Sequence, residues 1–165
     1  ISIQFYYRIL SAVREYMQDE MMGFLDRPVH PRAFPVFCEA ATGYPDFESL
    51  IRFANDFYGL LTDEFSWRLE NNVENGTTML SIEFKKGAEK YKRFIIEFLM
   101  VTSYRFGSWL IGEHYPIITV HFTFPKPDNI EKYQYLLGKK IHFGAERNGI
   151  VFNSGVLSQA IIRGQ

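Results

Sequence analysis

One run of polar side chains lies inside the most apolar segment of the sequence and offers the best chemistry for holding a small molecule. The run follows "FIIEFLMV" and comprises Thr102, Ser103, Tyr104 and Arg105. Hydroxyl and guanidinium groups orient a ligand by hydrogen bonds, while apolar neighbours bury its body. Aromatic side chains with a polar tip supply both functions, and the candidates besides Tyr104 are Trp67 and Trp109. These three either line a pocket or fill the core.

Glu97 is the second unusual residue of this segment, because it interrupts "FIIEFLM" with a charge. An uncompensated charge in an apolar interior is expensive. The carboxylate either pairs with Arg93 one turn before it or Arg105 two turns after it, or it contacts a bound ligand. The candidate ligand-binding residues are therefore Trp67, Glu97, Tyr104, Arg105 and Trp109.

The sequence carries no pattern typical of a catalytic or metal site. The four histidines, His30, His114, His121 and His142, are too scattered for a local metal motif. Cys38 lies on an apolar helical face without a sequence-local base, which favours an inert core thiol. No Ser-His-Asp, paired-carboxylate or phosphate-loop arrangement is visible. We expect a protein that is not an enzyme and that uses no cofactor or metal.

Composition and charge limit the class of protein. The 165 residues suit one domain, and 47% hydrophobic and 17% aromatic residues provide a large interior. With 18 basic and 19 acidic side chains, the net charge of −1 offers nothing to neutralise a phosphate backbone. A single cysteine favours a reducing, cytoplasmic location, and no apolar run reaches the roughly 18 residues of a membrane span. The missing initiator Met and the ending "SQAIIRGQ" predict a piece of a longer protein.

Hydrophobic spacing predicts helices in the first part of the chain. Apolar residues recur at helical intervals before Met17 and again between Pro31 and Gly43. The clearest helix runs from Asp46, a capping residue, to Leu61 and carries one broad apolar stripe. Helices of this kind bury one face.

At Phe65 the period of the pattern changes to two, and this change predicts a β-hairpin around Asn75-Gly76. A two-residue turn places Leu69 opposite Ile82 and Trp67 opposite Phe84. On the other face it places Arg68 beside Glu83. The register agrees with the alternation of apolar and polar residues.

The remaining elements alternate between helix and strand. A long helix from Gly87 to about Gly112 is apolar on nearly every side, so it belongs in the middle of the fold. A strand, a short helix from Asp128 to Leu137 and two more strands follow, with a turn at Asn148-Gly149. The expected fold is α+β, with a helical N-terminal half packed on a mainly antiparallel sheet of about five strands and one long buried helix.

Two stretches carry a resemblance to a known family: "MGFLDRPVHPRAFPVFCEAATGYPDFESLIRFANDFYGLLTDEFSWRLE" and "TVHFTFPKPDNIEKYQYLLGKKIHFGAERNGIVFNSGVL". Their ordered combination resembles the N-terminal effector-binding domain of AraC/XylS-type transcriptional regulators, in the OruR-like subgroup with an arabinose-binding-type domain. The matching positions of the second stretch are Phe122, Pro125, Pro127, Tyr133, Gly138, Ile141, Phe143, Asn148, Val151, Phe152 and Leu157.

The resemblance implies that residues 1–165 form a single sensory domain, which binds an unidentified small-molecule effector and controls an attached DNA-binding domain with two helix-turn-helix units. That second domain is absent from this sequence, so contact with DNA is expected only through it. A homodimer is possible, and no membrane is involved. Two alternatives stay open: a ligand-free dimerisation module of such a regulator, and a small-molecule enzyme.

An effector is expected between the long helix and the concave face of the sheet, in reach of Trp67, Tyr104 and Arg105. A helix that is apolar on nearly every side must contact both the sheet and the N-terminal helices. A pocket where these layers meet would therefore take its few polar groups from that helix.

The charge balance generates a first prediction: the isolated chain folds but does not bind DNA. The reason is its net charge of −1 and the lack of a basic helix-turn-helix segment. A mobility-shift assay with an arbitrary duplex at low salt measures this. Tight binding that weakens with added salt would contradict it.

Overall fold

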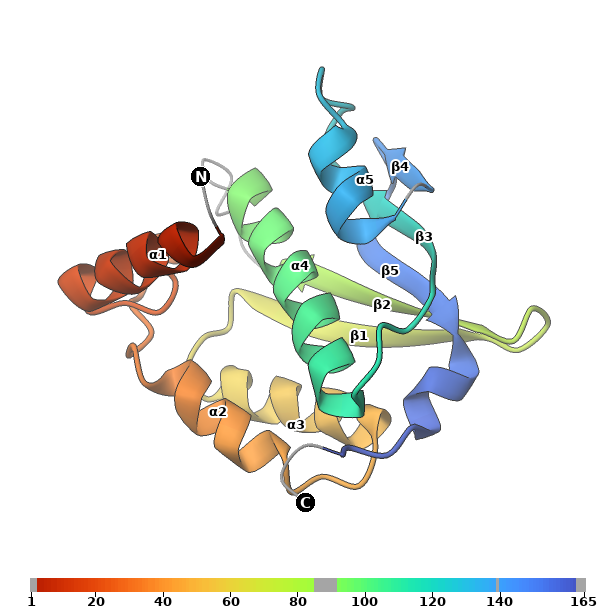
Figure 1. The fold of residues 1–165 in the computed structure, drawn as a ribbon, viewed down its shortest axis with the longest axis horizontal. Coiled ribbons are helices and arrows are strands. Elements are labelled where there is room, and N and C mark those ends of the chain that lie inside the picture. The colour runs from red at the N-terminus through yellow and green to blue at the C-terminus, as the bar shows by residue number, and fades with distance from the viewer. Residues whose placement is uncertain (1–2, 85–91, 139, 163–165) are drawn as a thin grey trace.

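Three helices open the chain, and a mixed region of strands and helices follows (Figure 1). The computed structural model describes residues 3–84, 92–138 and 140–162. The elements in order are α1 (Ile3–Met17), α2 (Ala33–Ala41), α3 (Phe47–Gly59), β1 (Phe65–Asn72), β2 (Thr77–Phe84), α4 (Lys92–Ile111), β3 (Ile117–Phe122), α5 (Glu131–Leu137), β4 (Ile141–Phe143), β5 (Asn148–Asn153) and the 3-10 turn η1 (Ser154–Ser158). The predicted α+β fold is confirmed.

The five strands form one sheet in the order β1-β2-β5-β3-β4. All pairings are antiparallel except β3 with β4, which run parallel because α5 connects them. One face carries the buried apolar side chains, among them Leu80, Ile82, Val120, Ile150 and Phe152. In Figure 1, α4 crosses the sheet, while α2 and α3 lie on the side of β1. The prediction of a mainly antiparallel sheet with a helical N-terminal half packed on it is therefore correct.

Helix α3 forms as its sequence predicts at the start and ends slightly earlier. The side chain of Asp46 accepts a hydrogen bond from the backbone N–H of Ser49 at 2.8 Å, which satisfies one free donor of the first turn. The apolar stripe is buried and consists of Phe47, Leu50, Ile51, Ala54 and Tyr58. Leu61 lies beyond the last helical residue, Gly59, and is 37% exposed.

The β1–β2 hairpin forms, but its predicted register is wrong by two residues. Leu69 pairs with Leu80 and Trp67 with Ile82, because the connection has four residues, 73–76, instead of two. The side-chain oxygen of Asn72 accepts the N–H of Asn75 at 3.2 Å within this connection. A shift of two residues keeps every side chain on its face, so the alternation of apolar residues could not reveal the error. Arg68 still reaches Glu83, diagonally, at 3.3 Å.

The predicted turn at Asn148-Gly149 is also wrong, since both residues open strand β5. The side chain of Asn148 is buried and accepts the backbone N–H of Thr123 at 2.9 Å. Gly149 allows a close approach of β2, because a Cβ there would lie 2.4 Å from Cε of Met79. The chain turns earlier, at Gly144, which has a φ of 69°.

The short helix α5 is confirmed, although it begins at Glu131 and not at Asp128. Gly138 follows its last residue with a φ of 91°, a backbone conformation that glycine adopts without strain.

Helix α4 lies in the middle of the molecule, as its apolar sequence predicts (Figure 1). Ile95, Ile96, Leu99, Met100 and Leu110 are at most 4% exposed. The first part of the predicted helix, residues 87–91, lies outside the described residues. Residues 93–111 are long and apolar enough to cross a membrane by length and composition alone. A core helix of a soluble fold has the same composition, and the packing of α4 against the sheet and the N-terminal helices is that of a core helix.

The β1–β2 connection generates a second prediction. Gly76→Val should lower the free energy of unfolding by about 1–2 kcal/mol, because Gly76 has a φ of 61° and a β-branched residue resists this left-handed conformation. A Cβ here would meet nothing within 4 Å, so the loss comes from the backbone alone. Gly76→Asn is the control, since Asn tolerates the conformation. Urea unfolding of both variants and the parent measures the effect, and a Val variant as stable as the parent would contradict it.

Candidate functional site

A cavity of about 330 Å³ lies between α4 and the three N-terminal helices. Helix α4 contributes residues 98, 99, 101–103 and 105–107, and Trp67 is the strand residue among the described lining. The other lining residues come from α1, the segment after it, α2 and α3: Leu10, Arg14, Glu20, Met21, Phe34, Phe37, Phe47, Leu50, Ile51, Ala54 and Tyr58. This volume is at the lower end of the range for small-molecule sites.

The cavity does not lie between α4 and the sheet, where the sequence predicted an effector. Helix α4 packs directly on β2 and β5 with fully buried side chains, including Ile95 from the helix and Leu80 and Ile150 from the strands. That layer is filled because each of these positions carries a branched apolar side chain. The space remains on the opposite side of α4, toward the N-terminal helices.

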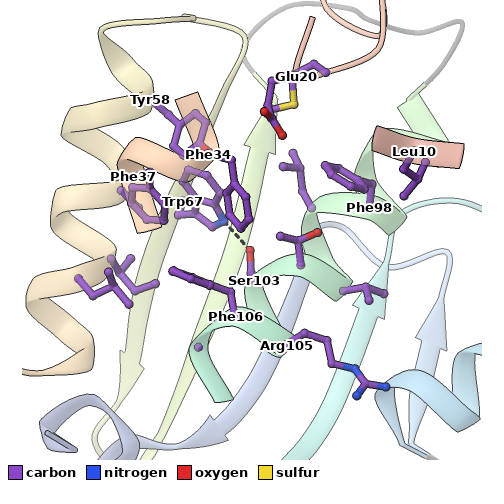
Figure 2. A pocket seen from close by; sticks show the side chains of 18 of the residues that line it. Leu10, Glu20, Phe34, Phe37, Tyr58, Trp67, Phe98, Ser103, Arg105 and Phe106 are labelled. Atoms are coloured by element: carbon purple, nitrogen blue, oxygen red, sulfur yellow. Dashed lines mark hydrogen bonds between the residues drawn. The ribbon is translucent and has the colours of Figure 1, made fainter. Parts of the chain in front are cut away.

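Aromatic rings form most of one wall (Figure 2). Phe37 on α2 stands at its centre, with its ring 5.4 Å from that of Tyr58 and 5.6 Å from that of Phe106. Phe34, one turn before Phe37, meets Phe106 edge-on at 5.5 Å. Trp67 meets Tyr58 edge-on at 5.5 Å. Rings from α2, α3, β1 and α4 therefore share one continuous contact.

Trp67 is fixed in this wall by hydrogen bonds to two helices. Its backbone N–H donates to Oδ1 of Asn55 at 2.7 Å, and its carbonyl oxygen accepts from Nδ2 of the same Asn55 at 2.7 Å. Its indole Nε1–H donates to the hydroxyl of Ser103 at 2.9 Å (Figure 2). Asn55 belongs to α3 and Ser103 to α4. The position of Trp67 thus depends on both helices that border the cavity.

Glu20 brings a negative charge to the cavity, and it is 4% exposed. Its Oε1 lies 3.3 Å from Nε of Arg14, which also lines the cavity. Burial raises the pKa of Glu20, Arg14 lowers it in part, and Asp19 raises it further. The net result is a carboxyl group with a pKa above its usual range.

The loop that holds Glu20 is organised by the neighbouring Asp19. The carboxylate of Asp19 accepts the backbone N–H groups of Met21, Gly23 and Val29 at 3.0, 2.6 and 2.8 Å. The backbone N–H of Glu20 donates to the carbonyl of Val29 at 2.6 Å. Glu20 therefore sits on a tightly bonded segment.

The candidate residues from the sequence fall into two groups. Trp67 and Arg105 line the cavity together with Thr102 and Ser103. Arg105 is an exposed residue, and Figure 2 shows its guanidinium directed away from the aromatic wall. Tyr104 and Trp109 lie outside the lining: Tyr104 packs edge-on against buried Tyr115 at 5.0 Å, and Trp109 stacks on Phe106 at 5.9 Å.

Glu97 also lies outside the cavity lining. It pairs with Arg93 at 2.9 Å, one of the two ion pairs that the sequence suggested. A tyrosine of α5 completes the group, since Tyr133 donates its hydroxyl to Glu97 at 2.5 Å and accepts from Arg93 at 2.7 Å. Burial and the Glu97 carboxylate raise the pKa of Tyr133. This network fastens α5 to α4.

Sequence reasoning missed Glu20, Arg14 and Asn55. Glu20 stands beside Asp19 at the start of "DEMMGFL", an acidic pair directly before an apolar run, and this was the available signal. Asn55 lies among the apolar residues of α3 without any local feature that marks it. Its partner is 12 residues away on a strand.

The remaining reactive groups show no assembled catalytic site among the described residues. No group of three or more His, Cys, Asp or Glu could hold a metal ion in the part of the chain that the structure describes. Burial raises the pKa of Cys38 to about 11, which keeps it a neutral thiol near pH 7. His121 and His142 are neighbours on β3 and β4, with ring centroids 4.9 Å apart, and burial together with His142 lowers the pKa of His121.

A solved transcriptional regulator has a similar fold. The crystal structure of transcriptional regulator CdpR from Pseudomonas aeruginosa superposes with a TM-score of 0.60 at 10% sequence identity, over 98% of this chain and 59% of that chain. The chain thus spans less than two thirds of this regulator, and identity at this level shows the fold alone.

The sequence identifies the family. Residues 1–161 match the family described as the arabinose-binding domain of AraC transcription regulator, N-terminal. The chain belongs to this family, and the resemblance drawn from its motifs is confirmed. No curated protein sequence matches the chain significantly.

The contacts of Trp67 generate a third prediction. Asn55→Ala should lower the free energy of unfolding by about 2 kcal/mol, because it removes both partners of the Trp67 backbone. In a Trp109→Phe background, the fluorescence of Trp67 should also shift, since its ring loses its fixed position. Arg52→Ala is the control on the same helix, where an exposed ion pair with Glu48 should contribute little to stability. Unfolding curves and emission spectra measure both effects, and an Asn55→Ala protein with the parent's stability and spectrum would contradict the assignment.

Proposed function

We propose that this chain is the ligand-sensing part of an AraC-type transcriptional regulator and that a small molecule bound in the cavity controls an attached DNA-binding domain. One observation carries the proposal: a cavity of about 330 Å³ with mainly aromatic and aliphatic walls lies in a chain of this family. Such cavities with a few polar groups are the usual form of small-molecule sites.

Of the candidate residues, Trp67 and Arg105 are the proposed direct contacts, because both line the cavity. Tyr104 and Trp109 support the wall from behind through Tyr115 and Phe106. Glu97 holds α5 against the other end of α4. These three would influence a ligand through packing and not through contact.

The walls suggest how occupancy reaches the rest of the protein. Helices α1, α2 and α3 face α4 across the cavity, and Trp67 bonds to α3 and α4 together. A ligand that fits one packing of these helices better than another shifts the population toward it. The shift can be coupled to a DNA-binding domain or to a second subunit if their contacts also prefer that packing.

The proposal treats residues 1–165 as one sensory domain. For the whole protein it includes contact with DNA, a homodimeric state and a cytoplasmic location. The support is membership of a family of regulator domains. The same membership supports a role without catalysis.

A second function has one observation in its favour. Helix α1 exposes Ile9 and Met17 at 44% and 45% and Tyr16 at 89%. Apolar side chains gathered on one helix suit contact with a second subunit. The chain would then serve as a ligand-free dimerisation module of the same kind of regulator.

A ligand screen with a blocked cavity is the fourth prediction. Compounds from a panel of amino acids, sugars, aromatic acids, amines and fatty acids should include some that raise the melting temperature of the parent, since a ligand at 100 times its Kd adds about 2.7 kcal/mol. Thr102→Trp should abolish the response, because residue 102 lines the cavity and the larger side chain fills it.

Leu60→Trp is the matched control, as it places the same side chain at a position that is 87% exposed. It should respond like the parent. A hit that stabilises Thr102→Trp as strongly as the parent binds elsewhere and contradicts the assignment of the cavity. A panel without any hit favours the dimerisation module.

A further inference from the structure

Glu20 sets the charge that a ligand in the cavity would meet. Its carboxylate is 4% exposed, and Figure 2 shows it at the edge of the aromatic wall, between Phe34 and Phe98. Two other charged groups line the cavity, Arg14 and Arg105. Arg105 is exposed and points away from the rings (Figure 2), so the pair of Glu20 and Arg14 determines which charged group can be accommodated.

The two members of this pair differ in how firmly they are held. The side chain of Glu20 is 5% exposed and that of Arg14 23%. Glu20 sits on the segment that Asp19 fixes with three backbone hydrogen bonds. The Nε of Arg14 is buried and, within the described residues, has no hydrogen-bond partner, although it lies 3.3 Å from Glu20. Arginine has a long flexible stem that reaches solvent readily. The carboxylate is thus the group that is fixed in position, and the guanidinium is the one that can move away.

This difference between Glu20 and Arg14 determines whether a matching ligand carries a positive or a negative charge. A cation can replace Arg14 beside Glu20, so that the buried charge stays paired while the guanidinium turns to water. An anion would have to lie beside a fixed carboxylate with Asp19 next to it, and unpaired buried charges are strongly unfavourable. The surrounding rings add to the preference, because the faces of Trp, Tyr and Phe attract cations. Arg14 already shows this, with its guanidinium 5.5 Å from the ring centre of Phe98.

The walls also limit the body of the ligand. Sugars carry several hydroxyl groups, and each one that is buried without a hydrogen-bond partner weakens binding. The polar groups of the lining belong to Glu20, Arg14, Arg105, Thr102, Ser103, Tyr58 and Trp67, and the indole N–H of Trp67 is already donated to the hydroxyl of Ser103. An apolar body with one charged group fits this inventory better than a polyol.

Resting on the proposed sensory function, we propose that the cavity selects an organic cation, whose ammonium group pairs with Glu20 and whose aromatic or aliphatic body lies among Phe34, Trp67 and Phe106. The ligand class is therefore a hydrophobic amine. Arg14 acts as the internal cation that occupies Glu20 until the amine arrives.

The test uses three probes of nearly equal size: 2-phenylethylamine, the neutral 2-phenylethanol and the anion phenylacetate. Binding is followed by calorimetry and by the fluorescence of Trp67 in a Trp109→Phe background. The amine should bind the parent about 10-fold to 100-fold more tightly than the alcohol, the range expected for a buried charge-assisted hydrogen bond. Phenylacetate should bind most weakly.

Two test variants, Glu20→Gln and Arg14→Met, and one control, Glu74→Gln, separate the role of the Glu20 carboxylate from a general loss of negative charge. Glu20→Gln should bind the amine no better than the alcohol, whereas Glu74→Gln, the same change at an exposed position, should keep the preference. Arg14→Met should bind the amine more tightly than the parent, because the internal competitor is gone. This second variant tests the proposal even if Glu20→Gln does not fold.

The pH dependence provides an independent readout. Burial raises the pKa of Glu20 above the ordinary 4.5, so the carboxylate takes up its proton in a pH range above that of an exposed glutamate. Protonation removes the negative charge, and amine affinity should fall over this range. The affinity of 2-phenylethanol should not change, since it carries no charge.

The outcomes distinguish this inference from the sensory function itself. If the alcohol or phenylacetate binds as tightly as the amine, or if Glu20→Gln keeps the preference, the cation proposal is wrong while the cavity remains a ligand site. If none of the three probes binds, the cation proposal also fails. The sensory function is then judged separately, by whether any compound of the wider panel stabilises the parent and not Thr102→Trp.

Discussion

The cavity depends on one residue, Trp67, being bonded to two helices at once. Asn55 holds its backbone from α3, and Ser103 holds its indole from α4. Without these bonds, the helices would meet the hydrophobic face of the sheet with nothing to fix their separation. Apolar packing is non-directional and favours closing a gap. Directional hydrogen bonds at the backbone and the side chain of one residue tie α3 and α4 to the same point of β1, and the space between the helices remains.

Hydrogen bonds also hold the buried charge of Glu20 in place. A carboxylate in an apolar wall raises the free energy of the folded state unless it is paired, and Glu20 is paired with Arg14 at 3.3 Å and with the backbone N–H of Phe34. The segment around it is nevertheless well bonded through Asp19. The hydrogen bonds of Asp19 therefore hold the buried Glu20 carboxylate in position, although burying this charge is unfavourable. Groups of this kind, desolvated and placed in a cleft, are common at functional sites. The ion pair of Glu97 with Arg93, outside the cavity, is completed by hydrogen bonds to Tyr133.

The elements could be predicted from the sequence because their signals are local. The cap at Asp46, the stripe of α3 and the apolar α4 are each contained in a few turns. Pairings between distant residues could not be predicted in this way. A two-residue slip of the hairpin leaves the faces unchanged, and Asn148-Gly149 has the composition of a turn although Gly149 serves as a point of close approach inside the sheet. The candidate site was half predicted for the same reason. The polar residues of α4 can be recognised locally because they interrupt an apolar helix. Asn55 and Glu20 reach the cavity only through contacts with segments far away in the sequence.

The bonds between Asn55 and Trp67 have a consequence at the rim of the sheet. Strand β1 is the outermost strand, and within the described part of the chain it has a neighbouring strand on one side only. Free backbone groups along such a border attract strands from other molecules and promote aggregation. At Trp67 the amide of Asn55 occupies both the N–H and the carbonyl oxygen, as a backbone neighbour would. The row of outward-facing donors and acceptors is thus interrupted at the third residue of β1, and this interruption disfavours pairing with a strand of another molecule.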